Sequence, residues 1–216
     1  MDVLGEILIT DFTEQRLRPA FGERIRFIGL QGSFRRGEQT FSSDLDVVVI
    51  LDRLDPGDLI RYREAAAGFE EWPNLCGFLC GIAELKSWPR YDLFTLYFDT
   101  EPVVGCLSDW IAPPGPDEAR EYIRIGAAGL FHETVHRALY GQPSEEALFA
   151  ALKSARFLVA AREYLRTGRY EGQLARLAEQ CGGLSRAVVS ALREHRLPED
   201  CAGLLLRFCQ ECLEQV

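Results

Sequence analysis

Residues 45–51 form the feature that most constrains the fold, a nearly continuous run of valine, isoleucine and leucine. A run of this length and composition predicts a strand that is buried on both faces, which requires protein layers on both sides of a sheet. Asp46 alone interrupts the run, and Asp44 directly precedes it. Since residues i and i+2 of a strand share a face, Asp44 and Asp46 are expected to project together where this strand begins.

Two carboxylates on one face repel each other, and a divalent cation between them relieves that repulsion. Earlier in the chain, Gly32 and Ser33 end a second short apolar run, residues 25–30. Glycine there lets backbone N–H groups and a hydroxyl approach an anion closely, and Arg36 can reach phosphate oxygens. The pattern favours a cation and phosphate site. The simpler alternative is that the aspartates cap a strand and Gly32 turns the chain.

The combination of Gly32-Ser33, a spacer, and Asp44-Leu45-Asp46 before an apolar strand resembles the signature of the polymerase-beta-like nucleotidyltransferases. The resemblance implies an α/β (α+β) domain in which helices pack against a mixed sheet. It also implies that Asp44 and Asp46 bind Mg²⁺ and that ATP is the nucleotide donor. The residues expected to hold the nucleotide are Gly32, Ser33, Arg36 and Ser43. The implied chemistry is in-line transfer of a nucleotidyl group with release of pyrophosphate.

Such sites normally add a third carboxylate from a neighbouring strand, which binds metal or takes the proton of the attacking hydroxyl. Asp92 is the favoured candidate because it stands near the start of residues 91–98, which we interpret as a strand. It is expected to serve both as base and as metal ligand. Glu84 is the alternative, although it lies beside Lys86, where an exposed ion pair is the ordinary interpretation.

The proline-rich segment at residues 111–116 predicts a domain boundary, because it can continue neither a helix nor a central strand. We expect a nucleotidyltransferase domain over residues 1–112 and a helical bundle over residues 113–216. Residues 151–168 resemble the C-terminal helical domain of streptomycin- and spectinomycin-type aminoglycoside adenylyltransferases. The lysine that follows Thr-Gly in that family is missing here. A phosphate contact from this domain would therefore have to come from Lys153, Arg156 or Arg169. Lys153, the only lysine of the helical half, is expected to point into an interdomain cleft and contact triphosphate, the alternative being a surface lysine.

Two further motifs invite other interpretations. His132-Glu133-Thr134-Val135-His136 matches the HExxH zinc motif, but no third ligand is marked, so packing, surface or substrate-contact histidines are favoured over a protease. Cys209-Gln210-Glu211-Cys212 has CxxC spacing inside an apolar helical pattern, which favours buried structural thiols. Seven cysteines in a chain of 216 residues indicate reduced thiols rather than a disulfide framework.

Composition excludes several function classes. The formal net charge of −9 argues against a protein that grips long RNA or DNA. No run approaches 18 apolar residues and the N-terminus lacks a basic start, so a cytoplasmic protein without a membrane span is expected. The leading hypothesis is Mg²⁺-dependent transfer of AMP from ATP to a hydroxyl of a small molecule, for which an aminoglycoside-like compound is one candidate. The alternatives are AMP transfer to a protein side chain and a non-catalytic nucleotide-binding module.

Overall fold

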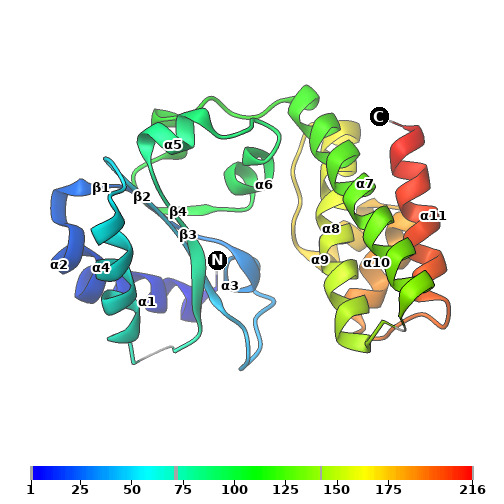
Figure 1. Cartoon of the computed structure of the whole chain (residues 1–216), viewed down its shortest axis with the longest axis horizontal. Coiled ribbons are helices and arrows are strands. Elements are labelled where there is room, and N and C mark those ends of the chain that lie inside the picture. The colour runs from blue at the N-terminus through cyan, green and yellow to red at the C-terminus, as the bar shows by residue number, and fades with distance from the viewer. Residues whose placement is uncertain (1, 71–72, 142, 216) are drawn as a thin grey trace. The chain divides into compact units, whose positions relative to one another are not determined.

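A computed structural model of the chain describes residues 2–70, 73–141 and 143–215. The chain divides into two compact units (Figure 1). The sheet unit comprises Met1–Pro89 and Thr95–Pro113, and the helical unit comprises Arg90–Phe94 and Pro114–Val216. Each unit is described below by itself.

The sheet unit contains four strands in the spatial order β3-β2-β1-β4. They are β1 (Ile25–Leu30), β2 (Leu45–Leu51), β3 (Leu75–Gly81) and β4 (Glu101–Val104). Strand β1 runs antiparallel to β2 and β4, whereas β2 runs parallel to β3. The sheet is therefore mixed, which confirms the fold class implied by the sequence. All residues of β2 are buried except Asp46, as its apolar run predicts.

Helices cover this sheet and join its strands. They are α1 (Val3–Phe12), a π-helical turn (Thr13–Leu17), α2 (Arg18–Phe21), a 3-10 turn (Gly22–Arg24), α3 (Gly32–Arg36), α4 (Pro56–Ala67), α5 (Ile82–Ser87), α6 (Leu93–Phe98) and a second 3-10 turn (Leu107–Asp109). Phe12 of α1 and Tyr62 of α4 pack with Val47 and Val49 in one hydrophobic core. The alternation of side chains along β2 then places Asp46 on the opposite face of the sheet.

Residues 91–98 correct the sequence analysis, because the expected strand is helix α6, preceded by a turn that contains Tyr91 and Asp92. A short apolar run does not distinguish a strand from a buried helical segment, so packing decides. Here the fully buried Phe94 contacts the rings of Tyr122, Tyr164 and Tyr170 in the helical unit. That aromatic cluster accounts for residues 90–94 belonging to the second unit.

The helical unit is built from α7 (Pro116–Tyr140), α8 (Glu145–Thr167), α9 (Leu174–Gln180), α10 (Gly183–Arg193) and α11 (Cys201–Glu214). Helix α7 packs against both α8 and α11, and α10 packs against α8 and α9 (Figure 1). Ser144 caps α8 by accepting a hydrogen bond from the Ala147 N–H, and Gly168 ends α8 with φ +72°. Within the described residues, none of the helices has the length and apolarity needed to cross a membrane.

The cysteines of the CxxC motif are buried in α11 as free thiols. Burial raises the pKa of Cys209 to about 12 and that of Cys212 to about 11. Both side chains are therefore neutral near pH 7 and fill the core, as the apolar helical pattern around them indicates.

Candidate active site

Asp44 and Asp46 lie where β2 begins, between the end of β1 and the start of β3. The Gln31 N–H donates to the Asp46 carbonyl over 2.8 Å, and the Leu45 N–H donates to the Asn74 carbonyl over 2.8 Å. Asp44 is exposed and Asp46 is half-buried. Burial raises the pKa of Asp46, and the charge of Asp44 raises it further, which is the expected repulsion between two neighbouring carboxylates.

Gly32 lies directly against Asp46. Its φ is +72°, and a Cβ built at this position would stand 2.8 Å from Asp46 Cγ and overlap the carboxylate. Glycine is thus required twice, for the left-handed conformation and for the space. Gly32 and Ser33 open helix α3, so the structure brings the Gly-Ser turn and Asp46 of the Asp-x-Asp pair together.

Arg36 lies in a buried ion-pair network. Its Nη1 donates to Asp99 Oδ2 and its Nε donates to Glu38 Oε2 over 3.0 Å, and its side chain is only 6% exposed. Arg35 Nη1 donates to the other Asp99 oxygen over 3.1 Å. The positive charge of Arg36 lowers the pKa of Asp46 and partly offsets the effect of burial. A phosphate contact by Arg36 stays a prediction.

Asp99 is a site residue that sequence reasoning missed. It is 3% exposed, accepts from two arginines, and its charge raises the pKa of Asp46. It follows α6 and stands just before β4, which pairs Glu101 with Leu30 and so brings this segment beside the Gly-Ser turn. Nothing in the local sequence distinguishes it from an ordinary helix-to-strand connection, because its position depends on the pairing of β4 with β1.

The structure separates Glu84 from the aspartate pair. A Cβ built at Gly81, the last residue of β3, would lie 2.8 Å from the backbone nitrogen of Leu54, which follows the end of β2. Glu84 lies in α5, directly after this point. Since β2 and β3 are parallel, Glu84 is near the opposite end of β2 from Asp46. The five steps along the strand from Asp46 to Leu51 alone span about 16 Å at roughly 3.3 Å per residue.

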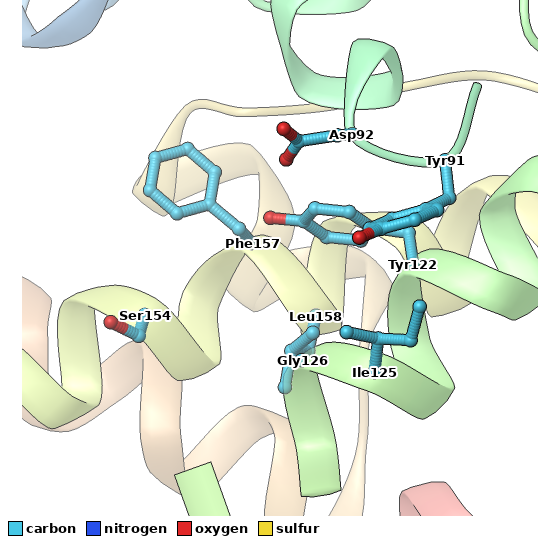
Figure 2. A pocket seen from close by; sticks show the side chains of 8 residues that line it. All are labelled: Tyr91, Asp92, Tyr122, Ile125, Gly126, Ser154, Phe157 and Leu158. Atoms are coloured by element: carbon cyan, nitrogen blue, oxygen red, sulfur yellow. The ribbon is translucent and has the colours of Figure 1, made fainter. Parts of the chain in front are cut away.

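Asp92 lines a pocket of about 230 Å³ within the helical unit. Its partners there come from the segment before α6 and from helices α7 and α8: Tyr91, Tyr122, Ile125, Gly126, Ser154, Phe157 and Leu158 (Figure 2). The pocket thus combines a carboxylate, a hydroxyl and several aromatic side chains. A role for Asp92 as base or metal ligand stays a prediction from the sequence.

The remaining predicted residues occupy ordinary surroundings. Lys153 is exposed on α8, directly before the pocket residue Ser154. Ser43 is half-buried, and its hydroxyl accepts from the Thr40 N–H over 2.8 Å. His132 and His136 are exposed one turn apart on α7, and their rings lie 6.2 Å apart between centroids. Among the residues that the structure describes, no group of three or more histidine, cysteine or acidic residues is arranged to hold a metal ion.

The aspartate pair nevertheless suits Mg²⁺. Both residues offer hard oxygen ligands at one edge of β2, and Mg²⁺ commonly binds one or two carboxylates, keeping its other positions for water and substrate phosphates. A site with two protein carboxylates therefore fits a cation that arrives with a nucleotide. Gly32 has no side chain, so at this position nothing stands between the turn and the Asp46 carboxylate.

Comparison with known proteins agrees with this architecture. Residues 14–75 match the family model described as a nucleotidyltransferase domain. A search of curated proteins gave no match. Among solved structures, the chain is similar to spectinomycin adenyltransferase AAD(9) from Enterococcus faecialis, whose crystal structure contains ATP and spectinomycin. The TM-score is 0.63 at 13% identity, covering 97% of this chain and 99% of that one. The family model confirms the nucleotidyltransferase domain expected from the Gly-Ser and Asp-x-Asp signature, and the similar structure confirms the fold of the chain.

Proposed function

We propose that this chain, a nucleotidyltransferase by its domain and its fold, transfers AMP from ATP to a hydroxyl group of a small molecule, with release of pyrophosphate. The observation that carries the proposal is the packing of Gly32 directly against Asp46. This contact puts the Gly-Ser turn, which we propose holds the phosphates, beside one of the two carboxylates proposed to bind the cation.

Asp44 and Asp46 would hold Mg²⁺ in this reaction. The bound cation would neutralise charge on the phosphates and favour departure of pyrophosphate. Gly32 and Ser33 offer backbone N–H groups and a hydroxyl to the phosphates, and Arg36 supplies positive charge beside Asp46. Asp99 holds Arg36 in place from its buried position. Asp92 is the proposed base for the acceptor hydroxyl, and Lys153 a proposed phosphate contact.

The pocket beside Asp92 supports a polar, cationic acceptor. Aromatic side chains such as Tyr91, Tyr122 and Phe157 offer faces on which a sugar ring or a cation can stack, and the Asp92 carboxylate offers an acceptor for ammonium groups. This combination suits an amino sugar or aminocyclitol. The spectinomycin in the similar adenyltransferase structure makes compounds of that type the first to test.

The test is pyrophosphate release from ATP and Mg²⁺ with a panel of aminoglycosides and aminocyclitols, followed by mass spectrometry of the acceptor. Asp44→Asn should abolish release, while Asp109→Asn, another exposed aspartate of the sheet unit, should keep it. An unchanged rate in Asp44→Asn would overturn the proposal. AMP found on a protein rather than on any compound of the panel would favour the protein-modifying alternative.

A further inference from the structure

Cys76 is the immediate neighbour of Asp46 on the adjacent strand. The parallel register of β2 and β3 pairs these two residues directly, so both side chains project from the same face of the sheet. Burial raises the pKa of the Cys76 thiol, and the charge of the neighbouring Asp46 carboxylate raises it further, so the two groups are close enough to interact. Asp44 lies two residues before Asp46 on the same edge, so the three side chains share one corner of the sheet.

Packing does not explain a cysteine at this position. Most cysteines of the chain are buried, but Cys76 is exposed, as is Cys106 after β4. A free cysteine that serves only as a small apolar side chain is normally buried. The Cys76 thiol instead stands beside the Asp46 carboxylate, where a cation is proposed to bind.

Position 76 is also the point from which β3 could supply a further ligand for the cation. Strand β3 is the parallel neighbour of β2, and Cys76 is the residue of that strand that is paired with Asp46 and shares its face. The acidic residue that follows β3, Glu84, lies near the far end. Among the described residues of β3, therefore, the place from which a third carboxylate could reach the cation carries a thiol.

We propose that Cys76 is a positioning residue, whose thiol holds one Asp46 oxygen and turns the other toward the cation, in the place of a third carboxylate ligand. This inference rests on the proposed function, because it assumes that Asp44 and Asp46 bind the cation. A thiol S–H is a weak donor, so it orients Asp46 without competing strongly for its charge. The site then holds its cation with two protein carboxylates and depends on the nucleotide for further ligands.

The experiment measures Mn²⁺ affinity of the whole chain without nucleotide, from the electron paramagnetic resonance signal of free Mn²⁺. Cys76→Asp should tighten binding by about tenfold or more, equivalent to roughly 1.4 kcal/mol, because it adds a carboxylate within reach of the ion. Cys76→Ser, which keeps a donor, should bind as the wild type does, whereas Cys76→Ala should bind more weakly. Cys106→Asp is the matched control, since it places the same charge at the other exposed cysteine, and should change little.

Equal Mn²⁺ affinity in Cys76→Asp and Cys106→Asp would overturn the inference. If the proposed function itself is wrong, Asp44→Asn also leaves Mn²⁺ binding unchanged, and this result distinguishes the two failures. A second measurement needs no variant: iodoacetamide labelling of Cys76 is compared by mass spectrometry with labelling of Cys106 in the same molecules. Mn²⁺ should slow labelling of Cys76 several-fold and leave Cys106 unaffected. Equal rates with and without Mn²⁺ would contradict the proposed position of the thiol.

Discussion

Replacing Gly32 by alanine is expected to disable the candidate site far more than it unfolds the protein. The new Cβ would stand 2.8 Å from Asp46 Cγ, well inside van der Waals contact, and the residue would keep a φ of +72°. Either α3 moves away from β2 or the Asp46 side chain leaves its rotamer. Both outcomes displace a proposed cation ligand from the Gly-Ser turn.

The variant Gly37→Ala separates the cost of backbone strain from the cost of the overlap with Asp46. It ends α3 with a φ of +69°, and a Cβ built there would meet nothing within 4 Å. Gly37→Ala should therefore lose only the backbone cost of a left-handed alanine, about 1–2 kcal/mol. Gly32→Ala should lose this amount and a further cost of about 0.5–1.5 kcal/mol for an off-rotamer side chain. The difference between the variants isolates the displacement of Asp46.

Urea unfolding gives the free energies, while Mn²⁺ affinity and pyrophosphate release report on the site. Gly37→Ala is expected to retain both site properties, and Gly32→Ala is expected to lose most of each while remaining folded at 25 °C. Wild-type Mn²⁺ affinity and turnover in a folded Gly32→Ala would refute the packing argument. Equal losses of activity in the two variants would show that strain in α3, and not the overlap with Asp46, is responsible.

Three further outcomes are expected. The hydrogen bond from Arg24 lowers the pKa of Asp58 from 3.8 to about 2, so its carboxylate stabilises the fold at neutral pH and loses this effect as the pH falls from about 4 to about 2. Asp58→Asn should therefore cost about 1–2 kcal/mol at pH 7 and flatten the acid side of the stability profile measured by urea unfolding. Asp99→Asn removes one of the two carboxylates that pair with the buried Arg36 and should destabilise the chain by about 3 kcal/mol, a prediction that an unchanged melting temperature would contradict. Glu84→Gln should leave Mn²⁺ affinity and pyrophosphate release unchanged, and a loss of either would contradict the distance argued from β2.

The parts of the site that follow from local sequence were predictable. Strand β2 could be predicted because its apolar run is long and nearly continuous. The alternation of side chains along a strand then predicts that Asp44 and Asp46 share a face. The glycine requirement at residue 32 was also predictable from the turn that ends β1. In both cases the prediction rests on residues that are neighbours in the chain, whereas the packing of Gly32 against Asp46 depends on the pairing of β1 with β2.

The parts that depend on distant pairing were not predictable. Cys76 is beside Asp46 only through the register of two strands that are about thirty residues apart in the sequence, and single-strand periodicity does not encode register between strands. Asp99 reaches Arg36 only through the pairing of β4 with β1. The apolar run at residues 91–98 became a helix because Phe94 packs among three tyrosines that follow much later in the chain.

The path of the chain between its two units makes the proline-rich segment a misleading place to cut. The backbone leaves the sheet unit at Arg90, returns at Thr95 and leaves again at Pro114. A fragment that starts at Pro114 would therefore lack Phe94 and leave its three tyrosine partners around an unfilled space. The complementary fragment would carry Phe94 without those partners. A gene that is split or fused at this segment would encode two proteins with incomplete cores. The helical unit could therefore be exchanged among relatives only together with residues 90–94, which supply Phe94 to its aromatic cluster.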